Sequence, residues 1–169
     1  MTLPITPSQT IGPFSHEAWG WAVHASDEVA GQPTTITISG IITDGAGTPI
    51  DDAMIEFTAL HAVDAEQANT LPGFRRTPSG ADGGYRFMLP GPAHGQPAAL
   101  VTVFARGLVL HQFSAVFLED DPALAASPVL EQVPSARRAT LIARRTGDRE
   151  YRWDIRMQGP SETVFFDYA

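Results

Sequence analysis

The stretch TTITISGIIT, residues 34–43, decides the fold class. Its isoleucines at positions 36 and 38 alternate with threonines, and β-branched residues with a period of two are typical of a strand that buries one face. Gly40 interrupts the run as a β-bulge would. Asp44-Gly45 then predicts a turn. The stretch therefore predicts a half-buried strand that leads into a tight turn.

Further short strands are predicted along the chain, separated by turn signals. The expected strands cover residues 53–60, 85–89, 99–104, 108–118, 151–158 and 163–168. Residues 61–79 lack periodicity and are expected to form a loop, whereas Asp82-Gly83-Gly84 and Thr146-Gly147-Asp148 predict turns. Helix is expected only over 122–126, behind the Asp121-Pro122 pair, and as a short turn within 136–145, a segment whose tail could equally start a strand. Roughly seven or eight strands with so little helix indicate an all-β sandwich or barrel.

Length and composition predict one globular domain. The 169 residues are 43% hydrophobic and 18% charged, which excludes a mainly disordered chain. Prolines at positions 4, 7 and 13 predict an extended N-terminal arm. We therefore divide the chain into an arm and lead-in segment, 1–33, and a single β domain, 34–169.

The net charge and the first residues restrict partners and location. A formal charge of −8 makes the chain a poor candidate for binding nucleic acid. There is no apolar run of membrane-spanning length and no secretory signal at the start, so no membrane partner is expected and a cytoplasmic location is predicted.

Few residues suggest chemistry by themselves. The absence of cysteine excludes thiolate metal sites, and the five histidines have no metal-binding spacing. The three tyrosines lie in predicted strands, where packing is the simpler role. Arg106 lies in the turn FARG between two apolar strands, where it is either an ordinary surface residue or a ligand for a carboxylate. The residues alone thus predict an all-β domain without a self-contained catalytic motif.

Several segments resemble the alpha subunits of the intradiol ring-cleaving dioxygenases. They are TPSQTIGPF (6–14), FARGLVLHQFSAVFLEDD (104–121), SPVL (127–130), RRATLIARR (137–145) and YRWDIRMQGPSETVFFDYA (151–169). The resemblance runs in order from about residue 6 to the end of the chain. It implies an all-β fold with a β-sandwich core, an extended N-terminal arm and very short helices.

The same resemblance implies that this chain holds no metal. Catalytic chains of the family bind Fe(III) through two tyrosines and two histidines, which lie in G-R-Y, P-G-P-Y and P-x-H-I-H runs. Here Pro90-Gly91-Pro92 precedes Ala93, the two histidine positions hold Ala99 and Val101, and residues 61–79 contain no tyrosine. The resemblance therefore implies no catalytic residue and no cofactor in this chain, with Fe(III) in a partner beta subunit.

The family also implies roles for the chain in an assembled enzyme. A higher oligomer of alpha and beta subunits would cleave protocatechuate, a small aromatic acid, with O2 to 3-carboxy-cis,cis-muconate. Thr10, Gly12 and Pro13 of the arm would lie against the substrate, and Arg106 would face its carboxylate.

Two alternatives to this function stay open. One is a homomeric intradiol enzyme with a rearranged iron site that uses Tyr85, His94 or His111. The other is a β-sandwich that binds an aromatic acid without catalysis.

Overall fold

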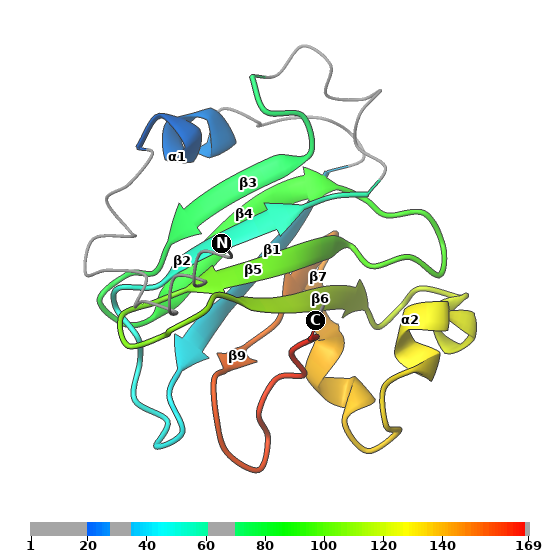
Figure 1. The fold of residues 1–169 in the computed structure, drawn as a ribbon. Helices are drawn as coiled ribbons and strands as arrows, with labels where there is room; N and C mark the ends of the chain where they lie inside the picture. Colours follow the sequence, from blue (N-terminus) through cyan, green and yellow to red (C-terminus); the bar gives the residue numbers. More distant parts are fainter. Residues whose placement is uncertain (1–19, 28–34, 61–69, 168–169) are drawn as a thin grey trace, which may run out of the picture.

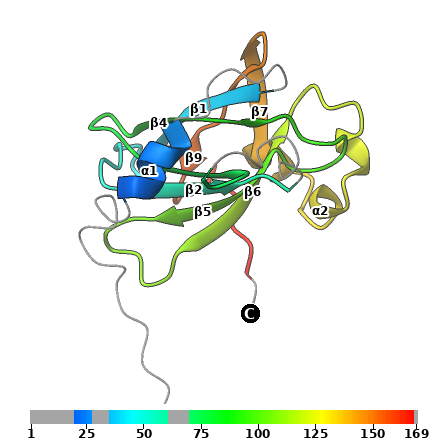
Figure 2. The ribbon, with the colours of Figure 1, turned by 90° about the horizontal axis from the view of Figure 1, so that it is seen from above.

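The computed structural model describes residues 20–27, 35–60 and 70–167. Nine strands in these ranges form one continuous sheet that folds into two layers (Figures 1 and 2). The first layer is antiparallel and holds β3 (Phe74–Pro78), β2 (Met54–Thr58), β5 (Ala99–Phe104) and β6 (Gln112–Leu118). The second holds β7 (Ile142–Gly147), β8 (Glu150–Arg152), β1 (Thr35–Thr43) and β4 (Gly84–Pro90), with β9 (Ile155–Arg156) also beside β1.

The hydrophobic core lies between the two layers, as a β-sandwich requires. On β1, Ile36, Ile38, Gly40 and Ile42 are buried, and the residues that alternate with them are partly exposed. Phe57 on β2 stacks on Phe87 of β4 with 3.4 Å between ring centroids, which joins the layers at the centre. The predicted all-β fold and the alternating pattern of residues 34–43 are both confirmed.

Gly40 has a different role from the predicted bulge. The β1–β4 register continues without a break through Ser39↔Arg86, Gly40↔Tyr85 and Ile41↔Gly84, so that prediction is wrong. A Cβ atom on Gly40 would lie 1.7 Å from the carbonyl oxygen of Trp153. The glycine is needed because the backbone between β8 and β9 passes directly over β1.

The segment 61–79 was expected to be a loop, and its end is instead strand β3. The strand FRRTP was not predicted because its sequence has no alternation of apolar and polar residues. It buries two arginines, Arg75 and Arg76. Its conformation is fixed by pairing with β2 rather than by propensity. The Nε of Arg75 donates to the carbonyl of Met88 at 2.6 Å, which ties β3 to β4 and nearly closes the sheet.

A helix that the sequence did not predict protects this edge strand. Helix α1 (Gly20–Asp27) lies within the segment 1–33 and packs against β3 (Figure 1). The backbone N–H of Arg76 donates to Ser26 Oγ at 2.8 Å, so the helix satisfies a donor that an edge strand would otherwise expose. The predicted extended arm, residues 1–16, lies outside the described ranges, and the division at residue 34 stays a prediction.

Three predicted strands are shorter than expected. The strand expected at 108–118 begins only at Gln112, because the chain first turns through Gly107 with φ +82°. The strand expected at 151–158 is split into β8 and β9 by the residues that pass over Gly40. The stretch 163–168 forms only an isolated bridge between Phe166 and Phe113.

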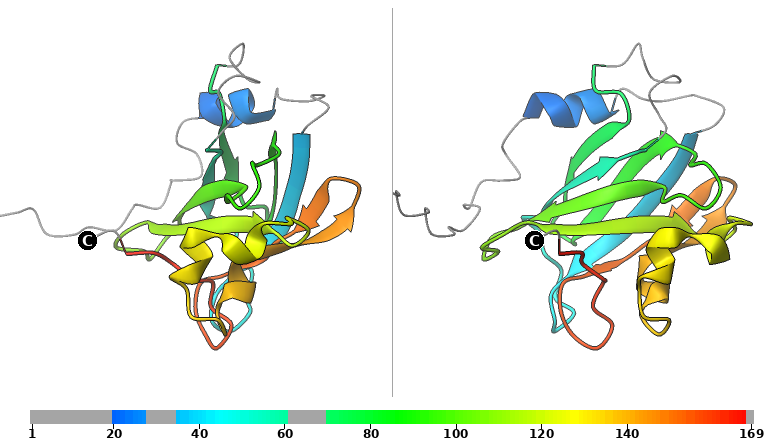
Figure 3. Two further views of the ribbon diagram at one scale, coloured as in Figure 1. Left: turned by 90° about the vertical axis from the view of Figure 1, so that its right-hand side faces the viewer. Right: turned by 45° about the vertical axis from the view of Figure 1, so that its right-hand side comes forward.

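The helices are very short, as expected. Helices η1 (Leu124–Ala126), α2 (Pro128–Glu131) and η2 (Arg138–Leu141) lie in the connection between β6 and β7, beside the end of strand β6 (Figure 3). Asp121 accepts a hydrogen bond from the N–H of Ala123 at 2.9 Å, but the helix begins only at Leu124 with Ala123 as its N-cap, so the predicted start behind Asp121-Pro122 is wrong. β7 and β8 form the predicted antiparallel hairpin, but its turn lies at Asp148 and Arg149, because Thr146 and Gly147 still belong to β7. None of the helices described is long and apolar enough to cross a membrane.

Candidate functional site

The residues that the resemblance places at metal positions lie after β4 and at the start of β5. Ala93 is exposed in the loop after β4. Ala99 and Val101 are buried, and because both alternate with exposed Leu100 they face the core between the layers. Val101 is paired with Phe57 of β2. These methyl and isopropyl groups offer no ligand atom, so the three positions do not fit an iron ion.

The space beside these positions is also too small for an aromatic substrate. A cavity of about 10 Å³ is bounded by Ala59, Leu60, Pro90–Pro92, Pro97 and Ala98. A volume of roughly 10–15 Å³ holds a single water molecule. This end of β5 is therefore part of the packed core rather than a binding cleft.

The residues suggested for a rearranged iron site contact three separate sets of neighbours. Tyr85 is buried in the core and donates to the carbonyl of Trp153 at 2.5 Å. His94 is exposed, and its Nδ1 lies 3.2 Å from Asp121 Oδ1. His111 packs against the rings of Phe104 and Phe113. Within 20–27, 35–60 and 70–167, no group of three or more histidine or acidic side chains could hold a metal ion.

The environment of Tyr85 keeps its phenol protonated. Burial raises its pKa well above the ordinary value of 10.0, and the nearby carboxylate of Asp154 raises it further against the smaller opposing effect of Arg152. A phenol in this state is a hydrogen-bond donor, and Tyr85 donates to a backbone carbonyl. Tyr85 therefore acts as a structural clamp between β4 and the segment that crosses β1.

Charged side chains gather at the opposite end of β5. The Nε of Arg106 donates to Asp52 Oδ2, and its Nη2 lies 4.0 Å from Asp51 Oδ1. The Asp52 side chain is only 11% exposed, whereas that of Arg106 is 60% exposed. The buried carboxylate thus holds the base of the guanidinium, and the terminal nitrogens remain accessible to solvent.

Sequence reasoning proposed Arg106 as a carboxylate ligand but missed its contact with Asp52, although a signal for that contact was present. In the antiparallel β2–β5 pair, Met54 is opposite Phe104. Continuing that register by two residues in each strand brings position 52 opposite position 106. An acidic pair just before one strand and an arginine just after its antiparallel neighbour therefore predict this contact, once the pairing is known.

The turn that carries Arg106 also presents apolar side chains. Val109 and Leu110, two adjacent apolar residues, are more than half exposed. A cation and apolar groups on one turn suit the two ends of an aromatic acid, the carboxylate and the ring. Thr10, Gly12 and Pro13, the other substrate-binding residues predicted, lie outside the described residues.

Comparison with curated proteins identifies close relatives over the whole chain. The chain is 37% identical to the protocatechuate 3,4-dioxygenase alpha chain of Burkholderia cepacia, over 98% of both proteins. It is 34% identical to the alpha chain of the same enzyme from Pseudomonas putida, again over 98% of both. The beta chain from Burkholderia cepacia is 25% identical over 95% of this chain and 78% of its own length. No protein-family profile matches the chain.

Solved structures of low sequence identity share the fold. A dioxygenase domain from Streptomyces sp. SirexAA-E has a TM-score of 0.60 and 16% identity over 78% of this chain and 84% of its own. An intradiol ring-cleavage dioxygenase from Tetranychus urticae has a TM-score of 0.53 and 11% identity, over 80% of this chain and 86% of its own.

The curated relatives include both chains of a two-chain enzyme, which indicates an alpha–beta assembly. The identity is higher to the alpha chain, 37%, than to the beta chain, 25%. The chain belongs to the alpha chains of protocatechuate 3,4-dioxygenase, within the intradiol dioxygenases.

Proposed function

We propose that this chain is the subunit without iron in an enzyme that cleaves protocatechuate. Together with a beta subunit it would add both atoms of O2 to the ring and yield 3-carboxy-cis,cis-muconate. The observation that carries the proposal is the apolar character of Ala93, Ala99 and Val101, in a chain that matches alpha chains along 98% of its length. The Fe(III) and its ligands would come from the beta subunit.

In this division of labour, Arg106 binds the carboxylate of the substrate. Its terminal nitrogens are accessible, and Asp52 restricts the guanidinium to a narrow range of orientations. A charge-assisted hydrogen bond contributes roughly 1.5–3 kcal/mol, which corresponds to roughly 10- to 150-fold in affinity. Because the Arg106 side chain is more than half exposed, we expect the lower end of this range.

The arm residues Thr10, Gly12 and Pro13 would complete the wall of the same pocket. Glycine permits a close approach of the backbone to a ligand, and proline limits the flexibility of the arm. The reactive centre would then lie between two chains, with the cation supplied by the alpha chain and the metal by the beta chain.

Kinetics of the assembled enzyme test this assignment. We expect Arg106→Ala to raise KM for protocatechuate about tenfold and to change kcat less, because the contact is equally strong in the ground and transition states. Arg145→Ala is a matched control, since Arg145 is a half-exposed arginine that also pairs with an aspartate, Asp120 at 3.6 Å. An unchanged KM in Arg106→Ala would remove Arg106 from the pocket.

A binding module without catalysis predicts a different result. In that case the chain alone would bind protocatechuate, and Arg106→Ala would abolish the binding without any beta subunit. Under our proposal the pocket is incomplete in the lone chain, so calorimetric titration of that chain with protocatechuate gives no measurable heat of binding.

A further inference from the structure

The basic residues of this acidic chain are concentrated in one segment. All eleven are arginines, and seven of them lie between residues 137 and 156. The same twenty residues hold only three carboxylates, so the segment has a net charge of +4 and the rest of the chain −12. A basic region of this kind creates a local positive potential that the overall charge conceals.

The strand register assembles several of these arginines into one row. Ser39 of β1 is paired with Arg86 of β4 on one side and with Arg152 of β8 on the other, and Arg152 is paired with Arg144 of β7. All three arginines are exposed on the outer face of the second layer. Directly opposed like charges destabilise a sheet, so Arg144 beside Arg152 has an energetic cost.

The charges in this row are only partly neutralised. Arg152 pairs with Asp154 at 2.9 Å. Arg86, Arg144 and Arg156 form no ion pair with any residue that the structure describes. The row therefore retains free guanidinium groups after the internal contacts are satisfied, and these are available to an external anionic partner.

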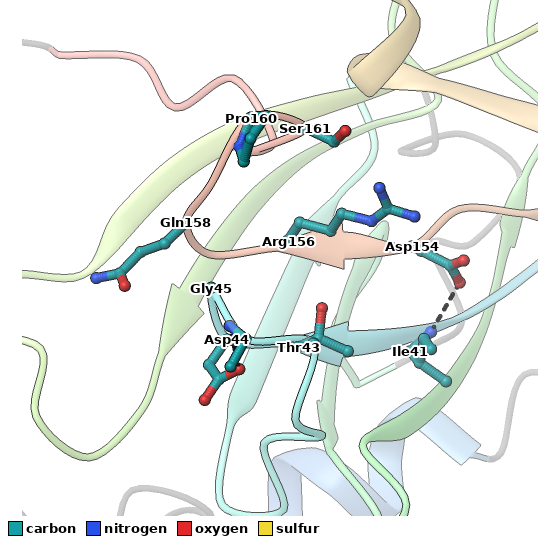
Figure 4. A pocket seen from close by; sticks show the side chains of 11 residues that line it. Ile41, Thr43, Asp44, Gly45, Asp154, Arg156, Gln158, Pro160 and Ser161 are labelled. Atoms are coloured by element: carbon teal, nitrogen blue, oxygen red, sulfur yellow. Dashed lines mark hydrogen bonds between the residues drawn. The ribbon is translucent and has the colours of Figure 1, made fainter.

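A groove runs beside the row and ends over β9. It has a volume of about 600 Å³, and Arg137, Arg144, Arg152 and Arg156 all line it. The Nε of Arg137 is buried there without a hydrogen-bond partner in the described part of the chain. A second pocket of about 390 Å³ continues the groove across Asp154 and Arg156 to the turn after β1 (Figure 4).

We propose that this arginine groove is a docking surface for carboxylate side chains of the beta subunit. An open sheet face fits a protein surface better than a small molecule, which usually binds in an enclosed, mostly apolar pocket. Arginine is enriched at protein interfaces and lysine is depleted, as it is in this chain. The planar guanidinium also binds carboxylates through two parallel hydrogen bonds. The proposal rests on the alpha–beta assembly that the relatives indicate.

The function of such a surface is to orient the partner. Complementary charge at the rim of an interface increases the association rate and fixes the register of the two chains. The groove lies on the outer face of the second layer, whereas Arg106 follows β5 in the first layer. Docking and substrate binding are therefore carried by different residues and can be tested separately.

Dissociation of the co-expressed complex on dilution tests the proposal. We expect Arg144→Gln combined with Arg156→Gln to weaken the alpha–beta affinity about tenfold at about 50 mM NaCl. The difference should fall below about twofold at about 500 mM NaCl, where surface charges are screened. The matched control is Arg145→Gln, the next residue on β7, which already pairs with Asp120 and does not line the groove. Circular dichroism of each complex verifies that the variants are folded.

The other occupants of the groove predict different outcomes. Unchanged affinity in the double variant, or an equal loss in Arg145→Gln, would overturn the proposal. So would loss of alpha–alpha contacts alone, detected by native mass spectrometry, because it would assign the groove to a second copy of this chain. Weakened alpha–beta affinity with an unchanged KM for protocatechuate supports the docking role, whatever Arg106→Ala does to KM.

Discussion

The two ends of strand β5 have different surroundings. At its start, Ala99 and Val101 are buried in the core, at the positions that the sequence resemblance assigns to iron ligands in catalytic chains. Just beyond its other end, two residues after Phe104, Arg106 is exposed and held by Asp52. The same strand thus has an inert end and a polar end. Under the proposed function, the loss of metal ligands changed side chains and left the backbone frame in place.

The largest expected effect comes from restoring histidine at the inert end. The double variant Ala99→His and Val101→His places two larger, polar rings in a packed core, and we expect it to lower the free energy of unfolding by about 3 kcal/mol or more. The matched control is Leu100→His on the same strand, because Leu100 is 38% exposed, and there we expect less than about 1 kcal/mol. Urea denaturation measures both. A stable double variant would mean that this end of β5 is still adapted to hold ligands.

An intermediate effect is expected from the carboxylate that orients Arg106. We expect Asp52→Asn to raise KM for protocatechuate about threefold to tenfold in the assembled enzyme, because the guanidinium loses its buried partner. Asp51→Asn removes the same charge from a side chain that is 62% exposed and 4.0 Å away, so its effect should be below about twofold. Equal effects would show that net charge, and not orientation, determines binding at this end.

Whether Asp52 acts through Arg106 is decided by a double-mutant cycle. If it does, adding Asp52→Asn to Arg106→Ala changes KM no further, because the residue that Asp52 positions is already absent. Fully additive effects would contradict the orienting role.

These charged contacts were harder to predict than the fold. Strand β1 was predicted correctly from the alternation of Ile36 and Ile38, and the β7–β8 hairpin from the turn signal at Gly147. Both features are determined by the local sequence pattern. Strand β3 was missed because it buries two arginines, Arg75 and Arg76, and a polar sequence of this kind is typical of a loop. Asp52 was missed because its contact with Arg106 spans 54 positions and depends on strand pairing. The local periodicity of a sequence does not show which distant residues strand pairing will bring together.

The smallest expected effect concerns pH and the core beside the inert end. Since burial raises the pKa of Tyr85, the unfolded chain ionises near the ordinary value of 10.0 while the folded chain does not. Stability is therefore fully present below pH 10.0 and declines as the pH rises above it. We expect Tyr85→Phe to make this loss of stability with rising pH smaller. Part of the loss should remain, because the pKa of Tyr151 is also raised. Denaturation at several pH values from neutral to alkaline measures the slope, and an unchanged slope in Tyr85→Phe would contradict the assignment.

The central claim is that the beta subunit supplies the iron and this chain does not. The most direct measurement is the iron content and visible absorption of the chain purified alone, compared with the chain co-purified with its beta subunit. We predict iron and a ferric–tyrosinate absorption band only in the complex. Iron and the band in the lone chain would contradict the account, and the ligands would then have to be sought among Tyr85, Tyr151, His94 and His111.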